Sequence, residues 1–68
     1  MRKGDKVMVR TIKDYKHRVF VRGPTGVMTP VNGLRGKVVG KGPRNEVMVW
    51  FPSMRRKVSL HPEWLRHV

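Results

Sequence analysis

The sequence contains no cysteine and only four acidic residues among 68. The missing cysteine excludes disulfide bonds, thiolate catalysis and cysteine-ligated zinc, and it suits a reducing cytoplasm, where we expect the protein to reside. The four acids are Asp5, Asp14, Glu46 and Glu63, scattered among expected turns and strand ends. They form no close pair of the kind that acid–base catalysis needs, so we expect no enzyme activity.

Long hydrophobic runs and metal-binding motifs are also missing. The longest apolar stretch, Val47 to Phe51, is far too short to span a bilayer. Met1-Arg2-Lys3 is followed by Gly4-Asp5-Lys6 rather than by the apolar segment of a signal peptide. The three histidines do not have the tight spacing of a zinc site. We therefore expect a soluble protein with no membrane segment, no metal and no other cofactor.

Positive charge is what the sequence has in excess. Sixteen Lys and Arg give a net charge of +12 and a pI of about 11.7. Solubility alone requires a net charge of only about 2 to 8 in a small domain. A larger excess repels itself unless a polyanion compensates it. The basic residues are spread evenly along the chain, eight in each half, so they belong to the fold rather than to a tail. The favoured partner is nucleic acid, DNA or RNA, and the alternative is an acidic protein surface.

Glycine, proline and alternating valines predict an all-β chain. Seven Gly and five Pro interrupt the sequence every few residues, and apolar positions recur with period two. We expect strands over residues 6–11, 36–41, 46–51, 56–60 and 66–68. Turns are expected at 42–45 and from Pro52 onward, and a single 3-10 turn at 61–65. Residues 12–34 are expected to form a long loop with room for a short ribbon around 19–21.

This order of elements resembles an SH3-like five-stranded small barrel, with a long loop after the first strand and a 3-10 turn before the last. The resemblance implies one domain over residues 1–68 and a closed or nearly closed barrel. Side-chain alternation places seven residues inside it. These are Val7, Val9, Val38, Val47, Val49, Val58 and Leu65.

Three local resemblances point to different functions. Gly33-Leu34-Arg35-Gly36-Lys37-Val38-Val39, followed by Val47-Met48-Val49-Trp50, resembles the KOW segment of ribosomal proteins and NusG-type transcription factors, which presents a basic loop to RNA or a polymerase. Lys3-Gly4-Asp5-Lys6-Val7 with Asp14-Tyr15, and Glu63-Trp64-Leu65 with Val68, is similar to the small stromal photosystem I subunit that docks ferredoxin. Val58-Ser59-Leu60-His61-Pro62 resembles the barrel of type II dihydrofolate reductase. That family carries Gln and Tyr where this sequence has Ser59 and His61, which speaks against the reductase activity.

Aromatic residues interleaved with cations form the candidate binding site. In an extended segment Arg18, Phe20 and Arg22 share one face. Trp50 is expected to point away from the core, with Lys37 and Lys41 across the hairpin. Rings beside cations suit a single-stranded nucleic acid, although a Trp covered by the long loop would be merely structural. The complete candidate set is Arg10, Arg18, Phe20, Arg22, Lys37, Lys41, Arg44, Trp50, Arg55, Arg56 and Lys57.

The sequence thus predicts a small basic protein that contacts the phosphate backbone of nucleic acid with little sequence specificity. A short protein of this type suits a bacterial or phage accessory factor. The alternative is a protein-interaction module that docks on an acidic protein partner through the same cations.

Overall fold

Strands dominate the structure, a computed structural model that describes residues 1–68. They contain 44% of the residues, and helices contain 10%. In chain order the elements are β1 (Lys6–Val9), α1 (Ile12–Tyr15), β2 (Phe20–Arg22), β3 (Met28–Pro30), β4 (Arg35–Lys41), β5 (Val47–Phe51), β6 (Arg56–Leu60), the 3-10 helix η1 (Pro62–Trp64) and β7 (Leu65–His67). The chain is mostly β, as predicted. Neither helical segment approaches the length and apolar character needed to cross a bilayer.

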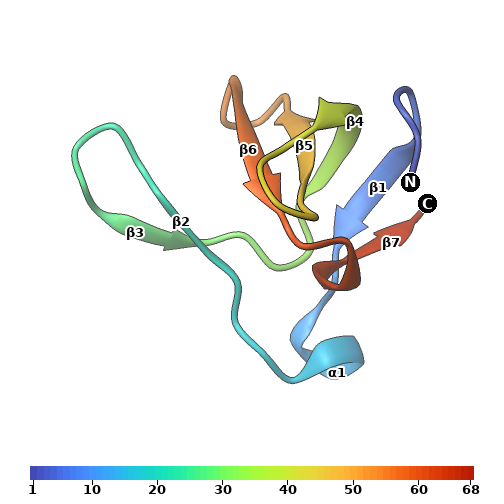
Figure 1. The fold of residues 1–68 in the computed structure, drawn as a ribbon. Coiled ribbons are helices and arrows are strands. Elements are labelled where there is room, and N and C mark those ends of the chain that lie inside the picture. The colour runs from blue at the N-terminus through green and yellow to red at the C-terminus, as the bar shows by residue number, and fades with distance from the viewer.

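Five strands form one antiparallel sheet in the order β6-β5-β4-β1-β7. The remaining two strands, β2 and β3, form a separate hairpin within the chain segment that connects β1 to β4. Figure 1 shows this hairpin projecting to one side, with the two termini together on the other. The pairing of β1 with β7 brings the termini together.

The sheet is open, which corrects the expectation of a closed barrel. Its edge strands, β6 and β7, are not hydrogen-bonded to each other. The reason lies in η1, which carries the chain from β6 across to β1 before β7 begins. There the backbone N–H of Arg10 donates to the Trp64 carbonyl at 2.8 Å.

The core is entirely apolar and consists of eleven buried residues. They are Val7, Val9, Val19, Val21, Val31, Val38, Val47, Val49, Phe51, Leu60 and Leu65. Six of the seven residues predicted to lie inside are buried. The exception, Val58, is only partly buried, although it still packs against the core. Val19, Val21 and Val31 come from the long segment between β1 and β4, which therefore covers part of the core.

That long segment contains a one-turn helix that the sequence interpretation missed. In α1 the Thr11 hydroxyl accepts a hydrogen bond from the backbone N–H of Asp14 at 3.3 Å. The helix ends at Lys16, whose φ of 61° lies in the left-handed region. A Thr followed by Asp three residues later is a local capping signal. Four helical residues are too few, however, to produce the apolar periodicity that predicts a helix.

Two side chains anchor the β2–β3 hairpin to the rest of the molecule. The Asn32 side-chain oxygen accepts from the backbone N–H of Val19 at 3.0 Å. Its amide nitrogen donates to the carbonyls of Arg10 at 2.8 Å and His17 at 3.0 Å. On the opposite side, the Arg56 guanidinium donates to the Arg22 carbonyl. The hairpin is thus tied to both β1 and β6.

Candidate nucleic-acid interface

Strand register gathers three lysines and one tryptophan in a line across the outer face of the sheet. Lys6 of β1 pairs with Lys37 of β4, Lys37 pairs with Trp50 of β5, and Trp50 pairs with Lys57 of β6. We call these four residues the cationic row. All four are exposed. Neighbouring strands lie about 4.8 Å apart, so Lys37 and Lys57 flank Trp50 at positions about 10 Å from each other.

Trp50 lies in this row with 36% of its surface exposed. Its ring makes neither of the two ring–ring contacts found in the protein, which join Tyr15 to His17 and His61 to Trp64. The side chain is therefore not a core residue covered by the long segment. Trp50 remains available to a ligand on the outer face, between two ammonium groups.

A second outward-facing line runs beside the cationic row. Met8 of β1 pairs with Arg35 of β4 on one side and with Arg66 of β7 on the other. Arg35 in this line and Lys6 in the cationic row both add to the positive surface, and neither was among the predicted contacts. Alternation within the first strand does place Lys6 outward. Which strand lies beside it is a matter of long-range pairing, which local patterns do not reveal.

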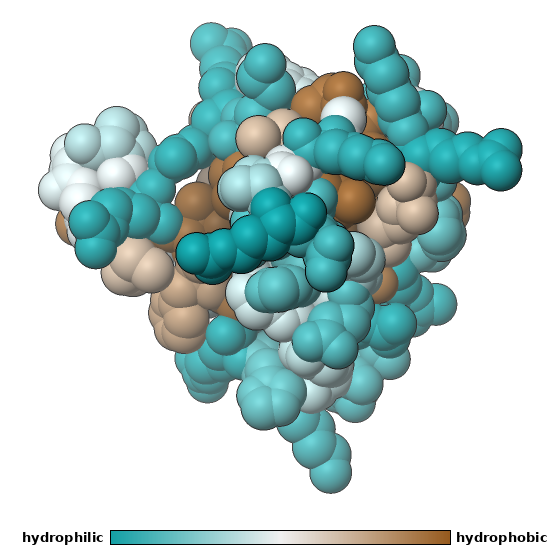
Figure 2. Space-filling model, viewed as in Figure 1, coloured by the Kyte–Doolittle hydropathy of each residue, from teal (hydrophilic) through white to brown (hydrophobic).

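Acidic groups are absent from the positions of the cationic row. Of the sixteen Lys and Arg, only Arg10 and Arg66 lie within 4.0 Å of a carboxylate, and both contact Asp14, at 3.1 and 3.9 Å. Glu46 lies 3.7 Å from His61. Figure 2 shows hydrophilic side chains extending from much of the visible face, with apolar patches between them. No carboxylate lies within 4.0 Å of a lysine of the row.

Asp5 is the acid closest in sequence to the row, and local hydrogen bonds hold it in its charged form. Its Oδ2 accepts from the backbone N–H of Arg2 at 2.9 Å and lies 3.2 Å from Nε2 of His67. The Arg2 hydrogen bond first, and the His67 contact second, lower the pKa of the Asp5 carboxyl below its ordinary value. Asp5 therefore belongs to the junction of β1 and β7 rather than to the row.

Two predicted phosphate ligands are engaged in structural contacts. The Arg10 guanidinium donates from Nε to the Glu63 carbonyl at 2.8 Å and from Nη1 to Asp14 at 3.1 Å. It thereby ties η1 to α1. Arg56 likewise uses Nη1 to hold the hairpin at the Arg22 carbonyl. Lys57, the third residue of the predicted cationic turn, lies instead in the row.

A bulge in β4 corrects the predicted position of Lys41. The register shifts between Val38 and Gly40, so that Gly40 pairs with Met48 and Lys41 pairs with Val47. Lys41 also lies four residues beyond Lys37, the partner of Trp50, so it is not a neighbour of Trp50 across the hairpin. The extra residue of a bulge displaces every later position by one, and alternation cannot anticipate it.

Two further predicted arginines lie in turns. Arg44 lies in the turn between β4 and β5, and Arg55 in the turn between β5 and β6. Both adopt a positive φ, 58° and 52° respectively. Both are exposed, and neither is near a carboxylate. They are free cations, but neither occupies a position in the cationic row.

The β2–β3 hairpin carries the remaining predicted residues as expected. Arg18, Phe20 and Arg22 are exposed, whereas Val19 and Val21 are buried. On the same outward face Phe20 pairs with Pro30, and Arg22 pairs with Met28. Exposed fractions reach 45% for Phe20, 50% for Met28 and 63% for Val27 near the tip. The hairpin thus presents a mixed apolar and cationic surface, separate from the sheet.

Comparison with protein-family models, with curated proteins and with solved structures finds no match for this chain. The local resemblances to KOW segments, to the photosystem I subunit and to the reductase barrel receive no support from these comparisons.

Proposed function

We propose that this protein binds nucleic acid through the phosphate backbone, with little sequence specificity. The cationic row is the observation that carries the proposal. Lys6 lies directly opposite Lys37, and like charges in directly opposed positions destabilise a sheet. No acidic residue compensates them at that position. A bound polyanion would remove this repulsion, whereas a purely structural sheet has no reason to accept it.

Phosphate contacts of this kind give affinity without sequence readout. A lysine ammonium is a compact point charge that binds phosphate without a fixed geometry. Contacts to phosphate set the position of a protein on nucleic acid, whereas base-edge contacts in a groove specify sequence. The row offers three lysines and one flat ring, and no Arg, Asn or Gln, the planar side chains that read base edges with a fixed geometry. Binding with little sequence preference follows.

The proposal extends to the type of fold. We infer that the open sheet is a variant of the SH3-like small barrel and that it contains a KOW-like segment. Strand order supports it, since a meander of β4, β5 and β6 joins β1, and a 3-10 turn precedes the last strand. The segment from Gly33 to Val39 leads into β4 and contributes Lys37 to the cationic row. The glycine at 36 sits where β5 approaches closely.

Docking on an acidic protein is the second candidate, and the hairpin favours it. Phe20, Val27 and Met28 are exposed apolar side chains beside Arg22, a combination found in protein–protein contacts. In that case the anionic partner would be a protein surface, and binding would depend on the hairpin more than on the row.

Paired charge-neutralising variants test the proposed function. Lys37→Gln with Lys57→Gln removes two cations from the row, and Lys3→Gln with Lys13→Gln removes two exposed cations elsewhere. The first pair should reduce the slope of log affinity against log salt by about 1.8 for duplex DNA, the worth of two phosphates. The control pair should change the slope by less than half as much. Equal effects of the two pairs would reject the row as the binding surface. Binding to an acidic polypeptide but to no nucleic acid would favour the second candidate.

A further inference from the structure

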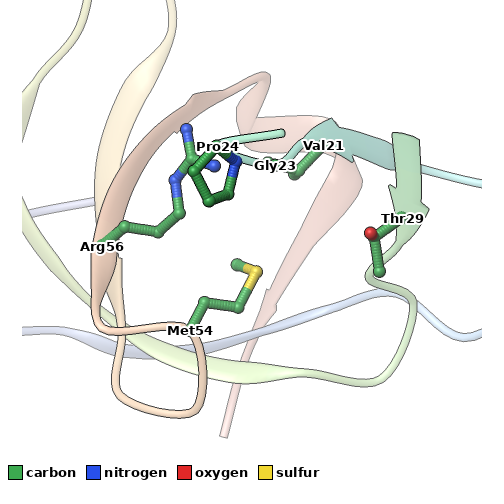
Figure 3. Close-up of a pocket in the computed structure, with 6 residues that line it drawn as sticks. All are labelled: Val21, Gly23, Pro24, Thr29, Met54 and Arg56. Carbon is green, nitrogen blue, oxygen red and sulfur yellow. The ribbon is translucent and has the colours of Figure 1, made fainter. Parts of the chain in front are cut away.

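A cleft lies between the β2–β3 hairpin and the turn that joins β5 to β6. It has a volume of about 250 Å³ and is lined by Val21, Gly23, Pro24, Thr29, Met54 and Arg56. Figure 3 shows Pro24 and Met54 on two sides of the space, with Thr29 on a third. Val21 and Thr29 pair across the hairpin, so they line the cleft from its inner face.

The walls of the cleft suit a flat, weakly polar group. A proline ring, a thioether and a valine provide apolar contact surface, and the Thr29 hydroxyl can donate or accept one hydrogen bond. Arg56 uses one N–H on the Arg22 carbonyl and keeps its other guanidinium N–H groups for a ligand. This mixture of apolar walls and a few polar groups is typical of a small-molecule site.

The size of the cleft limits the occupant to a fragment. Pockets for drug-sized ligands typically measure roughly 300–1,000 Å³. A cleft of about 250 Å³ accommodates a single planar ring system and little more. A rod-like duplex cannot enter it, because the bases of a duplex are stacked and paired.

Charge around the cleft selects an anionic ligand. Arg56 lines the cleft itself, and the exposed Arg55 lies next to it in the β5–β6 turn. None of the four carboxylates lines the cleft. A ligand whose flat part enters the cleft would therefore carry its negative charge beside Arg56 and the β5–β6 turn.

We propose that this cleft receives one unpaired base of a single-stranded nucleic acid, whose neighbouring phosphates lie on Arg56 and on Arg55 beside it. The inference rests on the proposed function and deepens it, because it names the single strand as the preferred ligand.

Strands that lack bases test this inference directly. We would compare a labelled oligothymidylate, the matching oligouridylate and an abasic strand of equal length, at one salt concentration, by fluorescence anisotropy. A base stacked on an aromatic ring contributes about fivefold to more than a hundredfold in affinity. Because no ring lines the cleft, we expect the lower end of that range, with the base-containing strands binding about fivefold more tightly than the abasic strand.

A space-filling substitution then assigns the base to the cleft. Thr29→Leu adds bulk from an exposed position without changing charge or adding a ring, and Thr25→Leu adds the same bulk at the hairpin tip. Thr29→Leu should remove most of the difference between intact and abasic strands, while Thr25→Leu should preserve it. Pro24→Ser, which removes one wall of the cleft, should act like Thr29→Leu. Circular dichroism establishes that each variant is folded.

Three results would overturn the inference. Equal affinity for intact and abasic strands would leave phosphate binding in place but remove any role for a base. A difference that survives Thr29→Leu and Pro24→Ser but is lost in Trp50→Leu would locate the base on the outer face of the sheet. Failure to bind any strand, together with binding to an acidic polypeptide, would reject the proposed function itself.

Discussion

Gly36 is the position at which the sheet depends on the absence of a side chain. A Cβ at this residue would lie 2.6 Å from the Trp50 carbonyl oxygen and 2.7 Å from Cγ1 of Val49. Gly36 also pairs with Val7 of β1 on the other side. Because β4 is held between two strands, it cannot move away from β5 without disturbing β1.

Replacing Gly36 by Ala should therefore destabilise the protein. We expect a loss of about 1–3 kcal/mol in the free energy of unfolding, the usual cost of overpacking. Gly40→Ala is the matched control in the same strand, since nothing lies within 4 Å of its Cβ position. Urea denaturation of both variants measures the difference. Similar stability of the two variants would contradict the close approach of β5 to Gly36.

Local alternation predicted which way individual side chains point, and it failed where position depends on pairing. Arg18, Phe20 and Arg22 face outward as expected, because their directions follow from the backbone of one extended segment. The contact of Lys6 with Lys37 could not be predicted, since it joins strands separated by the whole long segment. The displacement of Lys41 depends on a bulge between Val38 and Gly40, which side-chain alternation does not reveal, although a glycine within a strand is a signal for one.

At the scale of secondary-structure elements, the long segment between β1 and β4 is organised by Asn32. Its amide satisfies three backbone groups, the N–H of Val19 and the carbonyls of Arg10 and His17. Val19 and Val31 on either side of this contact are buried. Asn32 thereby fixes the base of the hairpin that forms one wall of the cleft.

Asn32→Ala should loosen the hairpin before it unfolds the sheet. Loss of the amide leaves partly buried polar groups without partners, at a cost of about 1–3 kcal/mol. Amide hydrogen exchange should accelerate in β2 and β3 and remain slow in β4 and β5. Asn45→Ala, in the exposed turn between β4 and β5, is the control and should change neither. Uniform acceleration across the sheet would show that the hairpin is not a separate unit.

Element boundaries were predictable where turn residues mark them. The strand over residues 56–60 and the 3-10 turn at Pro62 lie where predicted, because proline and the preceding turn fix both ends. Helix α1 was missed because one turn has no periodicity. The open edge between β6 and β7 was missed because closure depends on where η1 directs the chain.

At the scale of the whole molecule, charge is distributed unevenly over the fold. Carboxylates contact basic side chains at α1, at the junction of β1 and β7, and between Glu46 and His61. The cationic row, the hairpin and the β5–β6 turn have no such contact. Net charge was predictable from composition. The separation of the carboxylates from the cationic row was not predictable, because it depends on which strands lie together. A surface that combines excess charge with missing counter-charges is what phosphate binding requires.

The salt dependence of binding tests this account most directly. Affinity for duplex DNA, and for a single strand of equal length, would be measured over a series of salt concentrations. If about five phosphates are neutralised, log affinity should fall against log salt with a slope near −4.5 for the duplex and −3.5 for the single strand. Affinity that barely changes between low and physiological salt, or no binding to either ligand at micromolar protein, would contradict the proposal that this surface binds the phosphate backbone.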